Sequence, residues 1–439
     1  MRTSTRLISV IAMIAILLSA CASTATAPAA TAPAAAPTSK PVEPKTETVT
    51  LNLWIFEGEQ GFLPNLIESF QKTHPNIKIE VTEIPEADYV TKIDTALAAG
   101  NPPDIGFIYE MRWLKAGKFL PIDNMIATKG IKLDEYNQGI IKNSCTLDGK
   151  LYCLGSYLGA VMLFYNKDMF DAAGLPYPSA TVPMTIDEYA AVAAQLTKPN
   201  DDLAKRVYGG SAGGSNWWND PANRFSPDGK KYDGYVNDEA TIHEFEVLAD
   251  MEKRGYSPSA ADSTLLGDVD LLSTKQQAMM IIDNIIAIKD CEEAKINWGA
   301  APVPVEKKGD QPWVSVWTDS SGVFAQSKHP QEALEFIYYS ITDGNKLRLD
   351  YGSLPLNSRI ATEGNWAGAS EGRKEAMQVV NLAHGSVWTP NFWDATGPEG
   401  DAYSFIVEGT KTAKEALDEA AKLGQEQLDK GWETWYAIQ

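Results

Sequence analysis

Acidic, basic and aromatic side chains stand where two apolar runs of the sequence end. They are Glu57 and Glu59 after the run 49–56, and Tyr109, Glu110, Arg112 and Trp113 at and after the end of the run 104–109. Carboxylate, guanidinium and phenol groups form hydrogen bonds with polar solutes, and aromatic faces cover apolar surfaces. We therefore expect these groups to contact a ligand. The alternative is that Glu57 or Glu59 only stabilises the N-terminus of the following helix.

A serine between glycines is a possible sign of nucleophilic catalysis. Residues Gly209 to Gly213 match G-x-S-x-G, the turn that carries the nucleophilic serine of many hydrolases. That turn needs a helix after it, and the polar, tryptophan-containing segment that follows here does not start one. The sequence has no metalloprotease, phosphate-loop or zinc-ligand motif, and we expect no cofactor. A pair of glycosidase carboxylates stays open, because such a pair is defined by a distance in space.

The elements that position the strand-end side chains alternate along the chain. Apolar periodicity predicts strands at 49–56, 77–81 and 104–109, with one helix ending before Pro75 and another ending at Gly100. This order of strands and helices is typical of a parallel sheet with right-handed crossovers. Ligands of such sheets lie beyond the carboxyl ends of the strands. The folded part is also longer than one core usually supports, so we expect two domains.

The segment 148–167 leads out of this sheet. It begins with Asp-Gly, which is a strong signal for a two-residue hairpin. Residues 158–165 contain almost no polar side chain, which predicts a strand buried on both faces. Gly155 and Gly159 favour a bend or a close approach of two backbones. We interpret the segment as the first crossing between two lobes; a core strand of a single domain is the alternative.

Cys145 and Cys153 flank the hairpin turn at a spacing that invites a disulfide in an exported protein. In an ideal two-residue hairpin, however, Cys145 stands opposite Tyr152, so the two cysteines are out of register by one residue. The register therefore argues against the disulfide. Cys291 has no evident partner in the sequence.

The rest of the chain also alternates between helices and strands. It contains a capping box at Thr185–Glu188 that starts a helix, an irregular segment at 208–234, a helix closed by Gly255, short strands at 278–282 and 314–317, a helix opened by Pro330, and a C-terminal helix at 412–435. Asp283 and Asn284 stand at the end of the first of these strands.

The first residues are typical of an export signal. Basic residues precede an apolar stretch at 7–18 that is too short to span a membrane. The sequence Leu18-Ser-Ala-Cys21 then resembles a bacterial lipobox. We expect residues 1–20 to be removed and Cys21 to carry a lipid that anchors the protein to the cell membrane. The alternative is an ordinary secretory cleavage site.

Composition indicates how the anchored chain meets its surroundings. Residues 21–48 are rich in Ala, Thr and Pro and offer little to bury, so we expect a disordered tether. The formal net charge of −20 disfavours nucleic acid and anionic ligands. We expect a monomer with no nucleic-acid partner.

Several short motifs run through nearly the whole chain in a characteristic order and spacing. They are Leu53-Trp54, Phe70 to Pro75, Pro102 to Ile105, Asp148 to Tyr152, Phe164 to Asp168, Thr185 to Tyr189, Gln277 to Met279, Lys328 to Phe336, and Gly352 to Pro355. Through them the chain resembles the family 1 extracellular solute-binding proteins, the carbohydrate-type receptors of bacterial ABC importers. The resemblance implies a receptor, not an enzyme, that closes on a sugar and delivers it to the membrane permease subunits of an ABC transporter.

The same resemblance implies an α/β fold of the type II periplasmic-binding-protein class. Two lobes are then joined by three crossing segments, with the ligand cleft between the lobes. The crossings are expected near 157–161, 317–321 and 362–370, the N-terminal lobe at 49–157 plus 322–362, and the C-terminal lobe at 158–316 plus 370–439.

A sugar has hydroxyl groups that need hydrogen-bond partners and flat C–H faces that need apolar contact. With the resemblance, the expected ligand-binding residues are Glu57, Glu59, Tyr109, Glu110 and Arg112 on one lobe, Trp217, Trp218, Asp283, Asn284, Trp388 and Trp393 on the other, and Trp317 and Asp319 at the hinge. Relatives often carry an aromatic residue where this chain has Asp283-Asn284, so a polar contact is expected there. Each tryptophan has burial in the core as its alternative role. A polyamine, a peptide or an osmolyte cation held by the same tryptophans is the alternative ligand, and a glycoside-acting hydrolase is the alternative activity.

Overall fold

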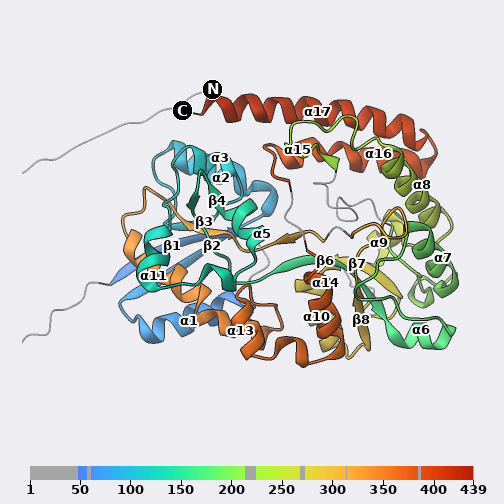
Figure 1. Ribbon diagram of the computed structural model, residues 1–439, viewed down its shortest axis with the longest axis horizontal. Helices are drawn as coiled ribbons and strands as arrows, with labels where there is room; N and C mark the ends of the chain where they lie inside the picture. The colour runs from blue at the N-terminus through green and yellow to red at the C-terminus, as the bar shows by residue number, and fades with distance from the viewer. Residues whose placement is uncertain are drawn as a thin grey trace, which may run out of the picture. The chain divides into compact units, whose positions relative to one another are not determined.

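The computed structural model describes residues 48–56, 61–212, 224–266, 272–312, 314–383 and 387–438. Figure 1 shows most of its strands in two four-stranded sheets flanked by helices, and β4 (Thr146–Leu147) and β5 (Lys150–Leu151) form a separate hairpin. The expected signal peptide, Cys21 and nearly all of the expected tether lie outside the described residues.

The first sheet has the strand order β10-β3-β1-β2. Its members are β1 (Val49–Phe56), β2 (Ile77–Ile84), β3 (Ile105–Phe107) and β10 (Ser321–Val323). β1 pairs in parallel with β2 and with β3, as the alternating pattern predicted. β10 pairs antiparallel with β3, so a strand from late in the sequence completes the edge.

Helices pack on this sheet through apolar faces. α1 (Leu63–Thr73) contacts β2, α2 (Glu86–Ala98) contacts β1, and α11 (Pro330–Ile341) contacts β1 and β10. Leu66 and Phe70 on α1 are buried with Leu51 and Leu53 of β1 in one core. Each such side chain contributes roughly 1.5–3 kcal/mol when it leaves water. The apolar side chains that recur along the sequence therefore form the core that stabilises this sheet.

The second sheet is centred on β6 (Gly159–Asn166), whose residues are all buried. β7 (Met279–Asp283), β8 (Trp298–Ala301) and β9 (Val316–Trp317) all pair antiparallel with β6. Met162 and Phe164 pack into the core shared with α10 (Asn284–Glu293) and α14 (Glu371–Val380). Leu163 and Tyr165 pack into a second core on the opposite face. Burial on both faces explains why the sequence at 158–165 lacks polar alternation.

The other elements connect or cover these sheets. They are α3 (Met111–Lys115), α4 (Asp123–Lys129), η1 (Leu133–Glu135), α5 (Gln138–Ile140), the π-turn η2 (Ile141–Cys145), β4 (Thr146–Leu147), β5 (Lys150–Leu151), α6 (Lys167–Ala173), α7 (Ile186–Leu196), η3 (Leu203–Lys205), α8 (Glu239–Lys253), α9 (Ala260–Leu266), η5 (Gly344–Lys346), α12 (Leu347–Tyr351), α13 (Ser358–Glu363), η6 (Trp366–Gly368), α15 (Phe392–Thr396), α16 (Pro398–Glu408) and α17 (Ala413–Ala437). Capping boxes at Thr185 and Thr412 start α7 and α17.

Three segments join the two sheets. The first leads from β5 into β6, and the second is the short stretch 318–320 between β9 and β10. The third runs from α13 through η6 to α14. Two α/β sheets joined by three segments confirm the expected fold class.

The hairpin β4–β5 corrects the expectation for the cysteines. The register is as predicted, with Thr146 opposite Leu151, yet Cys145 and Cys153 form a disulfide with Cα atoms 4.9 Å apart. The pairing lasts only two residues on each strand, and Cys145 is the last residue of the π-turn η2. Cys145 still accepts from the N–H of Tyr152, its partner in the predicted register, at 2.8 Å. Cys145 belongs to η2, however, and Cys153 lies beyond β5, so the register of this two-residue ladder does not keep the two sulfur atoms apart. Cys291 is buried and lies outside the disulfide.

Candidate ligand site

The side chains at the carboxyl end of β3 are held in an acidic cluster. Arg112 donates from Nη1 and Nη2 to the two carboxylate oxygens of Asp94, at 3.0 and 2.7 Å. Its Nε lies 3.6 Å from Oε2 of Glu110, the N-cap residue of α3. Tyr109 donates its hydroxyl to Glu86 at 3.0 Å. The geometry fixes Arg112 and places its single positive charge between two carboxylates, those of Asp94 and Glu110.

Burial changes the protonation behaviour of this cluster. Desolvation raises the pKa of Glu110 above its usual range, and the neighbouring charge of Arg112 opposes that rise. Asp94 and Asp394 raise the pKa of Glu110 further. Desolvation also raises the pKa of Tyr109, so its hydroxyl stays protonated.

Two of the predicted tryptophans, Trp388 and Trp393, lie at or next to α15 and α17. Trp393, in α15, exposes 47% of its surface. The ring of Trp388 packs at 4.6 Å from the ring of Trp435 and at 5.8 Å from that of Trp432, centroid to centroid. Trp388 is thus largely engaged with α17, whereas Trp393 keeps an accessible face beside Asp394.

Lys115 links α3 to the end of α17. Its Nζ lies 4.5 Å from the ring centroid of Trp435 and donates to the carbonyl of the same residue. Figure 1 shows the C-terminal end of α17 directed toward α3. The structure therefore brings the C-terminal end of α17 to α3, the helix that carries Arg112.

Asp283 and Asn284 occupy the end of β7, as predicted. Asp283 pairs with Val161 in the ladder. Asn284 is 2% exposed; its Oδ1 accepts from the backbone N–H of Ala160 at 2.9 Å and its Nδ2 donates to the carbonyl of Leu158 at 3.2 Å. Both ends of the Asn284 amide hold the first crossing segment. A ligand contact from either residue stays a prediction.

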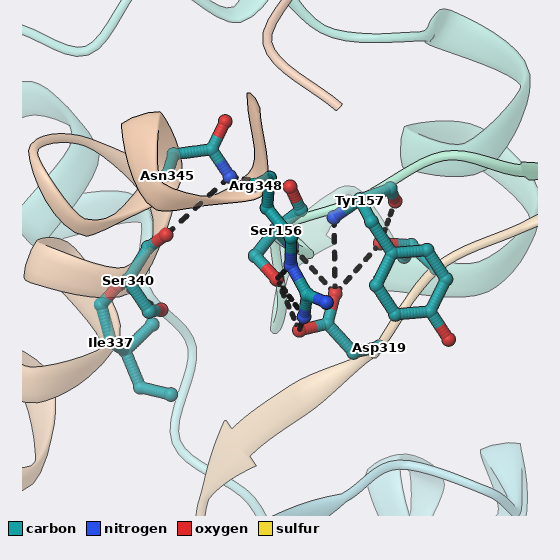
Figure 2. Close-up of polar contacts among 8 residues, drawn as sticks. Ser156, Tyr157, Asp319, Ile337, Ser340, Asn345 and Arg348 are labelled. Carbon is teal, nitrogen blue, oxygen red and sulfur yellow. Dashed lines mark hydrogen bonds and ion pairs between the residues drawn. The ribbon is translucent and has the colours of Figure 1, made fainter. Parts of the chain in front are cut away.

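The two hinge candidates contact the first crossing segment. The indole of Trp317 covers Gly159, where an added Cβ would come within 2.5 Å of the ring. Oδ1 of Asp319 accepts from the backbone N–H of Ser156 at 2.5 Å, and its Oδ2 accepts from Ser156 Oγ at 2.6 Å (Figure 2). Asp319 therefore joins two crossing segments, and its expected ligand contact stays a prediction.

Four predicted site residues lie outside the described part of the chain. They are Glu57, Glu59, Trp217 and Trp218. Their roles stay predictions.

Some residues of this region were not predicted from the sequence. Asp94 was missed because helix periodicity does not show which polar residue of α2 meets the side chains of α3. Trp432 and Trp435 are three residues apart in a predicted helix, and that spacing was a usable signal for a shared face. Arg348, described below, gave no local signal.

The serine of the G-x-S-x-G string has a structural contact. Ser211 Oγ accepts from the backbone N–H of Ile281 at 3.0 Å, which ties it to β7.

Among the described residues, no three His, Cys, Asp or Glu side chains are grouped as a metal ion would need. No helix in the same part of the chain is both long and apolar enough to cross a membrane.

Two α/β sheets with their helices, joined by three connecting segments, define a two-lobed protein. The chain belongs to the family of bacterial extracellular solute-binding proteins, whose family model matches residues 57–347.

Individual relatives extend over most of the chain. It is 23% identical over 402 residues to the galactooligosaccharide-binding protein of Bacillus subtilis, covering 86% of this chain and 89% of that protein. It is 23% identical over 333 residues to the multiple sugar-binding protein of Streptococcus mutans, covering 69% of this chain and 74% of that protein. Its fold is similar to that of an ABC substrate-binding protein from Listeria monocytogenes solved in complex with cycloalternan. The TM-score is 0.73 at 21% identity, with 87% of this chain and all of that chain covered.

Proposed function

We propose that this protein is a receptor that binds a sugar or short oligosaccharide between its lobes and delivers it to an ABC permease. Family membership supports solute binding. Relatives named for oligosaccharides and sugars support the ligand class. Hinge closure around the ligand is the motion known for periplasmic binding proteins, and the three joining segments are compatible with it.

One observation carries the choice of ligand. The partly exposed indole of Trp393 lies on α15, which packs against α17, and Lys115 of α3 contacts Trp435 of α17, so the Glu110–Arg112 end of α3 and α15 both adjoin α17. An indole face covers the C–H plane of a sugar ring, and carboxylates accept hydrogen bonds from its hydroxyls. Arg112 adds a donor whose own charge is already paired with Asp94. This combination fits a neutral, hydroxyl-rich ligand and disfavours an anion.

The cellular setting is part of the proposal. Cys21 carries a lipid and residues 21–48 tether the receptor to the outer face of the cell membrane. The lobes comprise 49–157 plus 322–362 and 158–316 plus 370–439, and the receptor acts as a monomer. The variant Cys21→Ser is expected in the soluble fraction; if it stayed in the membrane fraction, the lipid anchor would be wrong.

A thermal-shift screen tests the ligand class. A sugar at a hundred times its Kd should stabilise the folded state by about 2.7 kcal/mol, a shift that such a screen detects. The panel contains mono- and oligosaccharides, polyamines, peptides and osmolyte cations at matched ionic strength. Stabilisation by sugars alone supports the proposal, and stabilisation by amines alone contradicts it.

An assay for new reducing ends separates a receptor from a glycosidase. The protein is incubated with each stabilising oligosaccharide, and the free reducing ends are measured over time. A receptor leaves their number unchanged. Release of reducing ends at a steady rate would identify an enzyme instead.

A further inference from the structure

The first two crossing segments are bonded to each other halfway between the sheets. Asp319 lies between β9, in the second sheet, and β10, in the first. Its carboxylate accepts both the backbone N–H and the hydroxyl of Ser156, at 2.5 and 2.6 Å. Next to it, Thr318 Oγ1 donates to the carbonyl of Tyr157 at 2.6 Å. Two consecutive residues of one crossing thus bind two consecutive residues of the other (Figure 2).

Arg348 fixes this junction to the first lobe. It belongs to α12, which follows α11 on the first sheet, and it is 1% exposed. Its Nε and Nη2 donate to Ser156 Oγ at 3.1 and 2.8 Å, and Nη2 lies 3.6 Å from Oδ2 of Asp319. The Ser156 hydroxyl thereby uses its one proton and both lone pairs. The guanidinium carbon lies 3.4 Å from the ring centroid of Phe62 and 4.8 Å from that of Tyr157, so it is enclosed between two rings.

The backbone of Ser156 is held as tightly as its side chain. Its carbonyl accepts from Nδ2 of Asn345, a side chain with no exposed surface, and from the N–H of Leu356 at 3.2 Å. Two residues further on, the backbone N–H of Leu158 donates to the carbonyl of Leu354 at 2.8 Å. Every polar group of Ser156 is therefore bonded to a residue outside its own segment.

The crossings also touch sterically at this junction. A Cβ added to Gly155 would lie 1.6 Å from Oγ1 of Thr318, so a side chain there would push the segments apart. Past the junction, toward the second sheet, Trp317 and Gly159 form the next contact between the segments. The two crossings therefore leave the junction together and enter the second lobe as a pair.

A buried ion pair by itself contributes little net stability, because removing both charges from water costs about as much as their attraction returns. Such a network instead fixes the segments that it joins in one defined geometry. We propose that Arg348, Asp319 and Ser156 form a positioning clamp that fixes the first-lobe end of two crossings, so that the lobes pivot on the second-lobe side of Asp319. For its effect on solute binding the clamp rests on the proposed function, and Asp319 acts in it as a positioning residue.

Hydrogen–deuterium exchange tests the clamp in the absence of any ligand. Asp319→Asn keeps the shape of the side chain but removes the charge that faces Arg348. Ser156→Ala removes only the bridging hydroxyl, and serves if the first variant fails to fold. The amides of residues 155–158 and 318–321 should exchange at least tenfold faster in either variant, because local opening sets exchange rates.

A second arginine–carboxylate pair provides the matched control. Arg373 donates to Glu292 at 2.7 and 2.6 Å between α14 and α10, both on the second sheet. Arg373 also lies 5.3 Å from the ring of Trp366 in the third crossing segment, so Glu292→Gln breaks this pair without touching the first or second crossing. It should leave exchange at residues 155–158 and 318–321 unchanged.

Binding supplies the second readout. The Kd for a sugar that the parent protein binds should rise at least tenfold in Ser156→Ala, and should stay within twofold in Glu292→Gln. Exchange at the crossings no faster than in Glu292→Gln would overturn the clamp. Faster exchange with an unchanged Kd would overturn its positioning role. A parent protein that binds no sugar would contradict the proposed function, while the exchange result would still decide whether the clamp exists.

Discussion

The guanidinium of Arg348 and the carboxylate of Asp319 meet at one hydroxyl group, that of Ser156, with Nη2 and Oδ2 3.6 Å apart. The contact joins a helix of the first lobe to two segments that lead into the second. It places the buried charge of Arg348 against both segments at once. The arrangement of the lobes, and with it the solute site, depends on this junction.

Trp393 offers the most direct test of the aromatic contact. Because its indole is 47% exposed, Trp393→Ala should change the free energy of unfolding by less than about 0.5 kcal/mol. If the indole covers a sugar face, the same change should weaken sugar binding about tenfold. Trp393→Phe should restore most of the affinity, because a phenyl ring covers part of the same area. Calorimetric titration measures the affinities; equal Kd values for Trp393→Ala and the parent would exclude this contact.

Asn284 should behave as a structural residue of the first crossing. Asn284→Ala leaves the N–H of Ala160 and the carbonyl of Leu158 without their partner, and each buried unsatisfied group costs about 1–3 kcal/mol. The free energy of unfolding in urea should fall by about 2–4 kcal/mol. Asn297→Ala, which removes a hydrogen bond to Asp168 on the surface, should have little effect. Equal stability of Asn284→Ala and the parent would show that the amide is dispensable.

The disulfide between Cys145 and Cys153 should stabilise the protein measurably. It closes a short loop just before the first crossing, and loop closure of this length contributes about 2–3 kcal/mol. A reductant should therefore lower the Tm of the parent protein and leave that of Cys145→Ser/Cys153→Ser unchanged. A parent Tm that did not respond to full reduction would contradict this contribution.

His243 should give the second lobe a pH-dependent contribution to stability. Its hydrogen bond to Glu306, at 2.9 Å, raises its pKa above the usual 6.5, and Asp187 and Glu246 add to the rise. The stabilisation is fully present below pH 6.5 and is lost as the pH rises through the folded-state pKa. The fall in Tm across that window should be smaller in His243→Gln than in the parent. An identical pH profile for the two proteins would rule out this role.

Local features of the fold could be predicted from the sequence. The strand at 49–56, the buried strand around 158–165, the capping box at Thr185 and the C-terminal helix from about Thr412 each depend on residues within one element. The position of Asn284 at a strand end could be predicted for the same reason. Its partners could not, because Ala160 and Leu158 are brought to it only by the pairing of β6 with β7.

Long-range features lay beyond sequence reasoning. Nothing around Arg348 distinguishes a buried arginine from an exposed one, since its partners Ser156 and Asp319 come from distant segments. A regular two-residue hairpin argues against the disulfide. Cys145, however, is the last residue of η2 and not part of β4, so the hairpin register does not decide whether it meets Cys153. The contact of Lys115 with Trp435 joins α3 to α17, two helices far apart in the sequence, and no periodicity encodes it.

Small-angle X-ray scattering with and without sugar tests the central claim most directly. The claim is that a sugar brings the two lobes together about the joined crossing segments. The radius of gyration should fall when a sugar identified by the thermal-shift screen saturates the protein, and should return to its first value after dialysis. A radius of gyration that stayed the same while calorimetry showed the sugar to be bound would contradict the account.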